Sequence, residues 1–323
     1  MSIRTIVVGA GRMGKNHLRV LREHPAFKVV EVVDPIAAGP GDLRVAKSLD
    51  DISADFDLAV IASTTDTHAT VATELIKRGK HLLVEKPLAS SAAVAREVHA
   101  LAEQAGVRLA VGHVERFNPA VRKLREVIAA SAIGKAIHFS FTRVGGYPAV
   151  TGQGNNVILD LAVHDIDVFS FLGGGQAELV SSVAHSTVKS QVIDTATLLL
   201  TSASGVTSDV HVNWITPTKI RQIRVTGTLG VCFVDYMMQT CELFGGALLS
   251  RTLPDEVNFA QLQSMYANSD KTVFGVEKFE PLKAQATALA RFINEGDLGE
   301  LCGGADAANA VSIAEQASSL PRR

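Results

Sequence analysis

The feature that most constrains the fold of this chain is a glycine-rich motif close to its start, Gly9-Ala10-Gly11-Arg12-Met13-Gly14. The motif follows a β-branched run at residues 3–8 and precedes helix-forming residues at 15–23. A lone motif of this spacing is weak evidence. Between a strand and a helix, however, it is typical of the turn that holds the pyrophosphate of a dinucleotide. The sequence therefore predicts a parallel α/β domain that binds a nucleotide cofactor.

Each residue of the motif has a physical role in this interpretation. Gly9 permits a tight turn, Gly11 lets the backbone approach the pyrophosphate, and Gly14 lets the helix pack close to the strand. Arg12 and Met13 are expected along the cofactor together with the glycines, and the N–H groups and dipole at the start of the following helix attract the phosphates. The alternative interpretation is a glycine turn without a ligand.

Asp34 stands twenty residues after Gly14, at the end of the next apolar run, residues 28–33. An acidic side chain at this position accepts hydrogen bonds from the adenosine ribose hydroxyls, and its charge repels a 2′-phosphate. The expected cofactor is therefore NAD, with NADP as the less favoured alternative.

Residues 1–118 alternate strand and helix signals in the way that a parallel sheet requires. The apolar runs are continuous rather than alternating, which is typical of a sheet covered on both faces. We therefore expect a Rossmann domain over 1–118. Its expected strands are residues 3–8, 28–33, 58–62, 81–84 and 107–111, and its expected helices are residues 15–23, 69–78 and 90–105.

The pattern changes in residues 119–323, which we expect to form a second, α+β domain. Longer runs of alternating apolar and polar residues appear, punctuated by glycines, and these predict a large, mostly antiparallel open sheet. The expected strands are residues 136–143, 177–187, 195–202, 206–214 and 219–226, and the expected helices are 119–130, 156–172, 282–294 and 305–319.

Composition argues against several kinds of partner. Lys and Arg total 31 against 33 Asp and Glu, a formal charge of −2, so the basic excess of a nucleic-acid binder is missing. No apolar run is long enough to cross a membrane, and the first residues lack the pattern of a signal peptide. The three cysteines are far apart in the sequence and predict neither a disulfide framework nor a metal site. A cytoplasmic protein is expected.

A lysine follows one of the expected strands, in Glu85-Lys86-Pro87. Ligands gather at the carboxyl ends of strands in a doubly wound sheet, so Lys86 can reach the nicotinamide edge of a cofactor. The alternative is a surface lysine, and these three residues alone do not exclude it.

A carboxylate and an imidazole lie four residues apart in Asp160-Leu161-Ala162-Val163-His164-Asp165. In an α-helix, Asp160 and His164 share a face, and the carboxylate fixes the tautomer of the imidazole and raises its basicity. Such a base suits the oxidation of a secondary alcohol, because it accepts the hydroxyl proton as hydride leaves the carbon. The alternative is an ordinary pair on the helix surface.

Together, the glycine motif, the lysine motif at 85–87 and the motif at 160–165 resemble the glucose-fructose oxidoreductase/inositol dehydrogenase (Gfo/Idh/MocA) family. The resemblance covers the whole chain and implies a Rossmann domain followed by an open-sheet domain. It also implies an NAD(P)-dependent dehydrogenase with Lys86, Asp160 and His164 in its active site, and a homodimer or homotetramer formed through the sheet. The residues that the resemblance places along the cofactor, besides the glycine motif and Asp34, are Thr64, Thr65, His68, Glu85 and Lys86.

A narrower resemblance is to the UDP-N-acetylglucosamine 3-dehydrogenase branch, carried by residues 112–119, 213–221 and 277–282. It implies a nucleotide sugar as substrate, and a diphosphate requires cationic side chains outside the cofactor site. The loop at 145–154 leads into the catalytic helix and carries no positive charge. The residues expected to contact the substrate are His113, Arg116, Arg143, Tyr147 and Lys219.

Three functions remain open on the sequence. The first is oxidation of a ring hydroxyl of a nucleotide sugar, with His164 as the base, Asp160 orienting it, and Lys86 steadying charge on the reacting oxygen. Lys86 and His164 can exchange roles. The second is the same reaction on a free sugar or a cyclitol, and the third is a non-catalytic regulator that binds NAD.

Overall fold

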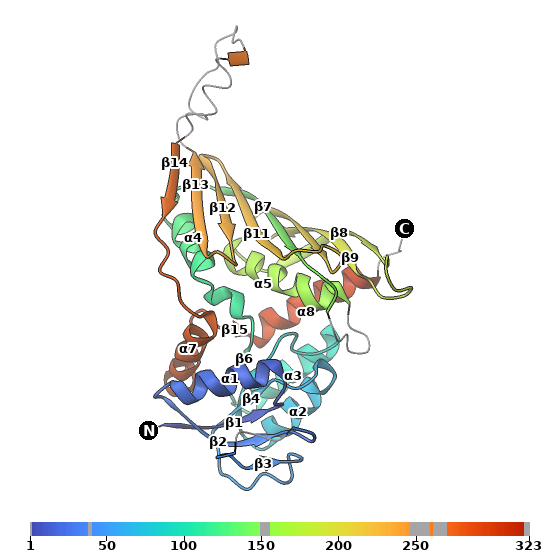
Figure 1. Ribbon diagram of the computed structural model, residues 1–323, viewed down its shortest axis with the longest axis vertical. Coiled ribbons are helices and arrows are strands. Elements are labelled where there is room, and N and C mark those ends of the chain that lie inside the picture. Colours follow the sequence, from blue (N-terminus) through green and yellow to red (C-terminus); the bar gives the residue numbers. More distant parts are fainter. Residues whose placement is uncertain (1, 38–40, 149–155, 246–258, 261–269, 320–323) are drawn as a thin grey trace. The chain divides into compact units, whose positions relative to one another are not determined.

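The computed structural model describes residues 2–37, 41–148, 156–245, 259–260 and 270–319. Its contacts divide the chain into two compact units (Figure 1). The first unit comprises Met1–Phe117, Val150–Asp167 and Glu280–Gln316, and the second comprises Asn118–Ala149, Val168–Phe279 and Ala317–Arg323. The expected domain boundary at residue 118 stays a prediction.

The first unit contains a seven-stranded sheet that is parallel except at one edge. β15 is antiparallel to β6, and every other neighbouring pair runs parallel. In spatial order the strands are β15 (Cys302–Gly303), β6 (Leu109–Val111), β5 (His81–Val84), β4 (Leu58–Ile61), β1 (Ile3–Val8), β2 (Phe27–Val33) and β3 (Val45–Ala46). The helices are α1 (Arg12–Glu23), α2 (Thr65–Lys77), α3 (Ala92–Gln104), α7 (Pro281–Glu295) and α8 (Gly304–Ser319).

Apolar side chains cover both faces of this sheet, as the continuous apolar strands predict. Ile6 and Val8 of β1 join a core with residues of α2, α3 and α8, whereas Ile3 and Val7 join a second core with residues of α1 and α7. Successive side chains of a strand point to opposite faces, so the two cores lie on the two sides of the sheet. The Rossmann-type architecture is confirmed, and the short strands β3 and β15 are additions to the prediction.

The second unit contains an eight-stranded, mostly antiparallel sheet, in which β7 and β10 form the parallel pair among the described strands (Figure 1). In spatial order the strands are β14 (Asp270–Phe274), β13 (Thr240–Gly245), β12 (Gly230–Asp235), β11 (Ile220–Gly227), β7 (Ala136–Val144), β10 (Thr207–Asn213), β9 (Thr195–Ser202) and β8 (Ala177–His185). The helices α4 (Pro119–Ala129) and α5 (Val163–Leu172) accompany it. The large open sheet is confirmed, and β12, β13 and β14 were not predicted.

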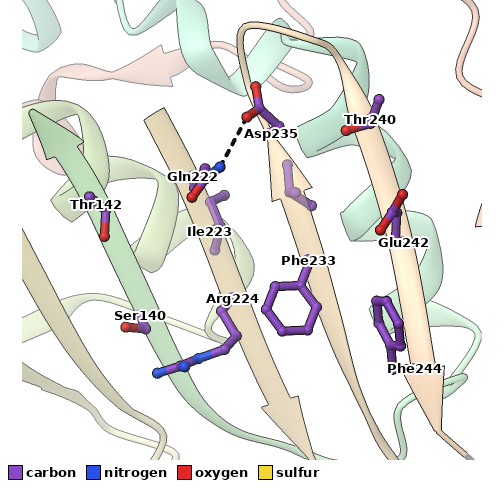
Figure 2. Close-up of a pocket in the computed structure, with 11 residues that line it drawn as sticks. Ser140, Thr142, Gln222, Ile223, Arg224, Phe233, Asp235, Thr240, Glu242 and Phe244 are labelled. Atoms are coloured by element: carbon purple, nitrogen blue, oxygen red, sulfur yellow. Dashed lines mark hydrogen bonds between the residues drawn. The ribbon is translucent and has the colours of Figure 1, made fainter. Parts of the chain in front are cut away.

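The two faces of this second sheet differ in character. Phe139 and Phe141 of β7 are buried, and the Phe139 ring packs edge-on against Phe169 of α5 with ring centroids 5.6 Å apart. The alternate residues Ser140 and Thr142 line a shallow pocket of about 630 Å³ on the other face (Figure 2). Alternation of this kind is typical of a sheet with one buried and one open face.

One expectation about local structure needs correction. Residues 156–172 were expected to form one α-helix, but Ile158–Ala162 form a π-helical turn before α5 begins. Cys232 and Cys241 are free thiols whose sulfur atoms lie 3.4 Å apart on the neighbouring strands β12 and β13, a proximity that the sequence does not indicate. In the described part of the chain, the helices are too short or too polar to cross a membrane. The cytoplasmic location stays a prediction.

Candidate active site

The glycine motif forms the connection between β1 and α1. Gly9 has a φ of +94°, and a Cβ atom there would lie 2.6 Å from the carbonyl oxygen of Ala62. A Cβ atom at Gly14 would lie 1.8 Å from the carbonyl oxygen of Gly9, whereas one at Gly11 would meet nothing within 4 Å. Gly9 and Gly14 therefore serve packing, and the open space beside Gly11 suits a ligand that approaches the backbone at the start of α1.

Asp34 lies directly beside this motif, at the end of β2. Its Oδ2 accepts a hydrogen bond from the N–H of Ala10 at 2.7 Å, and its Oδ1 accepts bonds from Ile36 and Ala37. Partial burial opposes ionisation, but the backbone N–H donors outweigh it and lower the pKa of this carboxyl. A negative charge is thus held where the motif begins, which fits the ribose of a dinucleotide better than a 2′-phosphate.

The residues expected along the cofactor in the β4–α2 connection differ in exposure. Thr64 is exposed and makes no side-chain cap for α2, and Thr65 is half-buried. His68 is buried, with Nδ1 2.8 Å from the carbonyl oxygen of Pro87 and Nε2 3.2 Å from that of Ser63. Both nitrogens of His68 thus face the protein, so a direct contact with the cofactor is not favoured there.

Glu85 is also turned towards the protein. Its Oε1 accepts a hydrogen bond from Nε2 of His17 at 2.6 Å, and both side chains are buried. Burial opposes ionisation of Glu85, but the hydrogen bond and charge of His17, together with Lys86, outweigh it and lower the pKa of the carboxyl. Glu85 is therefore a buried anion paired with α1, and its expected contact with the cofactor stays a prediction.

The structure brings Lys86 and Asp160 together, although 74 residues separate them. Nζ of Lys86 donates to the backbone carbonyl of Asp160 at 2.7 Å and lies 3.2 Å from its Oδ1. The side chain of Lys86 is 16% exposed and that of Asp160 is 31% exposed, so both remain within reach of a ligand. The π-helical turn contains Asp160 and leads directly to the half-buried His164, and such turns are frequent at functional sites.

His113 occupies the position next to Lys86 on the neighbouring strand. Val84 of β5 is paired with Val111 of β6, so the two chains leave the sheet in register, with Lys86 and His113 two residues beyond. His113 is fully buried, and burial, reinforced by the positive charges of Arg116 and Lys86, lowers its pKa against the opposing effect of Asp167 and Glu85. A neutral imidazole therefore lies beside the lysine.

Arg116 does not suit the contact with substrate that the sequence predicts. Its side chain is 4% exposed, and its Nε and Nη2 donate to the carboxylate of Asp167 at distances of 2.6 to 3.1 Å. Arg116 also donates to the carbonyl oxygen of Leu301 and to Asp306. A buried guanidinium with these acceptors is held in place by the protein and is not available to a substrate.

Asp167 is not among the site residues that the sequence predicts, and the structure gives it a structural pairing role in this region. It lies three residues after His164 and seven after Asp160, and this helical spacing was the available signal. Burial opposes its ionisation, but His113 and Arg116 outweigh it and lower the pKa of the carboxyl. Asp167 therefore anchors the start of α5 through a buried ion pair.

One cluster in this unit has ligand types that metals use, but its chemistry argues against a metal ion. The ligand atoms of His113, Asp167 and Cys302 lie within 4.8 Å of one another. Burial holds the pKa of the Cys302 thiol well above its usual range, and Arg116 already occupies the carboxylate of Asp167. A metal needs a thiolate and a carboxylate that are free to bind it.

The remaining residues expected to contact substrate belong to the second unit. Arg143 is buried, with its guanidinium carbon 4.8 Å from the centre of the Tyr236 ring. Tyr147 packs against Trp214 with ring centroids 5.4 Å apart, and burial raises the pKa of its hydroxyl. A Cβ atom at Gly145 would lie 3.3 Å from Cγ of Lys219, so that lysine lies beside the described start of the glycine-rich loop. Residues 149–154 of the loop lie outside the described residues.

Two family models match this chain. Residues 3–113 match "Oxidoreductase family, NAD-binding Rossmann fold", and residues 121–232 match "GFO/IDH/MocA C-terminal domain". The two matches follow the order of the two sheets along the sequence.

Individual proteins with similar sequences or structures include named dehydrogenases. The chain is 32% identical over 178 residues to the rhizopine catabolism protein MocA of Rhizobium meliloti, covering 52% of this chain and 56% of that protein. It is 31% identical over 231 residues to inositol 2-dehydrogenase 2 of Saccharopolyspora erythraea, covering 66% and 67%. The solved structure of UDP-N-acetylglucosamine 3-dehydrogenase GnnA from Acidithiobacillus ferrooxidans superposes with a TM-score of 0.80 at 21% identity, covering 98% and 97%. At that identity the superposition shows the fold alone.

Proposed function

The chain belongs to the Gfo/Idh/MocA oxidoreductase family, and from this premise we propose that it transfers hydride between a secondary ring hydroxyl of a sugar and NAD. The observation that carries the proposal is the contact between Lys86 and Asp160, in the same unit as the glycine motif and Asp34. Together with His164, these residues would supply the groups that oxidation of an alcohol needs: a proton acceptor, a cation for the oxygen and a nucleotide-binding turn.

Each side chain has a role in the proposed reaction. His164 accepts the hydroxyl proton, Asp160 orients His164, and Lys86 donates a hydrogen bond to the reacting oxygen and steadies its developing negative charge. When bound, a nicotinamide ring supplies the acceptor for the hydride. The proposal includes an exchange of roles between Lys86 and His164, because both belong to the proposed active site.

The proposed cofactor is NAD, which rests on Asp34. Its lowered pKa keeps the carboxylate ionised, and the bond from the N–H of Ala10 keeps it beside the glycine motif. A 2′-phosphate at that position would meet a negative charge rather than the cation that NADP sites provide. The backbone of Gly9 to Gly14 and the start of α1 would hold the pyrophosphate.

Two substrate classes follow from different observations. The motifs at 112–119, 213–221 and 277–282 favour a nucleotide sugar, and UDP-N-acetylglucosamine is the first substrate to test. The burial of Arg116 and Arg143 favours the second class, a free sugar or cyclitol, because it removes two of the cations proposed for a diphosphate. Lys219 and Arg221 are the others.

The experiment is the appearance of NADH absorbance when the purified protein is mixed with NAD and one substrate. UDP-N-acetylglucosamine, myo-inositol and glucose are tested in parallel, and each is repeated with NADP. Turnover with the nucleotide sugar alone supports the first class, and turnover with a free polyol alone moves the assignment to the second. Binding of NAD without turnover of these substrates, or of the corresponding keto sugars with NADH, would instead support the non-catalytic regulator.

We also propose that the chain forms a homodimer or homotetramer through the open face of the second sheet. Figure 2 shows Arg224, Phe233 and Phe244 on this face, and the last two rings pack edge to face with centroids 5.4 Å apart. Phe233 is 44% exposed in the single chain. Aromatic and arginine side chains of this kind are enriched in the buried centre of interfaces between proteins.

A further inference from the structure

Two buried histidines hold the segment Glu85-Lys86-Pro87, and each comes from a different helix. His17 of α1 donates from Nε2 to the carboxylate of Glu85 at 2.6 Å. His68 of α2 donates from Nδ1 to the carbonyl oxygen of Pro87 at 2.8 Å. The two histidines are 3% and 1% exposed, so both bonds lie in an interior where they are protected from competing water.

The carboxylate of Glu85 has little freedom apart from its bond to His17. A Cβ atom at Gly112 would lie 3.1 Å from the carboxyl carbon of Glu85, so the backbone directly after β6 closes one side of it. On another side, the N–H of Lys86 donates to Oε2 of Glu85 at 3.3 Å. The position of His17 therefore influences the peptide unit from which the lysine side chain departs.

His68 acts on the opposite side of the lysine. Its Nδ1 holds the carbonyl of Pro87, and its Nε2 faces the carbonyl oxygen of Ser63 at 3.2 Å. Ser63 belongs to the connection between β4 and α2, one residue before Thr64. The imidazole thus lies between this connection and the backbone that follows Lys86, and donates to the latter.

We propose that His17 and His68 are positioning residues for Lys86, because they fix the backbone on both sides of it and so direct its Nζ to Asp160. The proposal rests on the function proposed above, in which Lys86 acts on the reacting oxygen. The helices α1 and α2 begin at the two connections expected to lie along the cofactor. The elements that receive the cofactor therefore also hold the lysine. A displacement of about 1 Å in such a group can reduce a rate by about 100-fold.

The experiment compares substitutions that remove each bond with substitutions that preserve it. Gln carries its amide nitrogen near the position of Nε2 of histidine, and Asn carries its own near Nδ1, so H17Q and H68N keep the donors that H17A and H68A lose. We expect kcat to fall about tenfold or more in each alanine variant, equivalent to about 1.4 kcal/mol, and to return to within about threefold of wild type in H17Q and H68N. The Kd for NAD, measured by calorimetry, should stay within about threefold throughout.

A matched control separates positioning from loss of stability. Arg44 is the partner of Glu31, another buried carboxylate of the same sheet, and the Glu31–Arg44 pair makes none of the contacts described above for the site. R44A should lower the unfolding midpoint and leave kcat within about twofold. If H17A does not fold because Glu85 is left charged and buried, the double variant H17A/E85Q replaces it in the comparison.

A second measurement does not depend on activity. Lys86 is labelled with an amine-reactive ester at fixed pH, and its rate relative to the exposed Lys77 is followed by peptide mass spectrometry. The proposal is supported if Lys86 is labelled several times faster in H17A and H68A, but not in H17Q, H68N or R44A. This holds even if the wild type turns over no substrate. In that case the proposed function fails, and the positioning of Lys86 by the two histidines stands. Unchanged labelling in the alanine variants would overturn the proposal, whether or not kcat falls.

Discussion

Arg116 forms a buried, bidentate ion pair with Asp167, with Nη2 and Oδ1 2.6 Å apart. The two residues are 51 positions apart, one after β6 and the other in the first half of α5. Because Asp167 stands three residues after His164, the ion pair fixes the helix that carries the proposed base. Arg116 is thus a structural cation, and its loss should lower the stability of the fold more than the rate of the reaction.

Replacement of Arg116 tests this directly. R116A leaves Asp167 charged and buried, so we expect the free energy of unfolding to fall by about 3 kcal/mol or more. R116K keeps a charge but loses the bidentate geometry and should fall between R116A and wild type. Urea denaturation measures both. A variant with normal stability and a raised KM for substrate would show instead that Arg116 serves binding.

Removal of the proposed catalytic lysine should abolish most activity without unfolding the protein. K86A loses the hydrogen-bond donor to the reacting oxygen, and we expect kcat/KM to fall by about 100-fold or more. The exposed Lys77 supplies the control, since K77A should keep wild-type activity. Steady-state production of NADH provides the measurement, and retention of more than a third of the activity in K86A would contradict the assigned role.

Cofactor preference should depend on the charge of Asp34. D34N keeps one side-chain oxygen as an acceptor for the backbone N–H groups but removes the negative charge that opposes a 2′-phosphate. We expect the ratio of kcat/KM for NAD to that for NADP to fall about tenfold, by a gain with NADP and a loss with NAD. An unchanged ratio would mean that another residue determines the preference between NAD and NADP.

Stability should fall on mild acidification because of His113. Burial lowers its pKa in the folded protein, so below the unfolded value of about 6.5 the unfolded chain binds a proton that the folded chain does not. The free energy of unfolding therefore decreases as the pH falls through this range, by at most about 1.4 kcal/mol per pH unit for one proton.

Urea denaturation at pH 7.5 and pH 5.5 measures the change, and H113N should show a smaller difference between the two. Burial also lowers the pKa of His24 and of His81, so the difference should shrink rather than vanish. An equal difference in H113N and wild type would assign the effect to those residues.

Assembly should depend on the open face of the second sheet. F233D places a charge beside Phe244 at the centre of the face that we propose to be buried between subunits. We expect the sedimentation coefficient of the variant to fall to that of a monomer, while K77E, on α2, leaves assembly unchanged. If F233D sediments like wild type and the wild type is oligomeric, the interface lies elsewhere.

Sequence reasoning succeeded where the signal was local. The glycine motif, Asp34 and the lysine motif each directly follow a strand, so strand prediction alone places them at the carboxyl edge of one sheet. The meeting of Lys86 and Asp160 was implied by the family resemblance rather than by spacing. Spacing instead suggested an α-helix through Asp160, where the structure has a π-helical turn.

The failures involve pairings between distant residues. Nothing adjacent to Arg116 indicates that Asp167 is its partner, and a cation near a site looks the same in sequence whether it faces a substrate or a buried carboxylate. Cys232 and Cys241 seemed unrelated because β12 and β13 were not predicted, and only the register of those strands brings the two thiols together. The burial of His17 and His68 is likewise a tertiary property that the sequence does not reveal.

The return of the chain to the first unit has a consequence for its synthesis. Leu289 and Phe292 of α7 complete the apolar core that also contains Val7 and Val20, yet they lie more than 260 residues downstream. A ribosome releases the strands and α1 long before α7 exists, so one face of the nascent sheet stays uncovered during most of translation. Exposed apolar surface of this kind promotes aggregation, and a fragment that ends at residue 118 would keep it permanently. Production of the cofactor-binding half therefore calls for residues 280–316 to be fused or co-expressed with it.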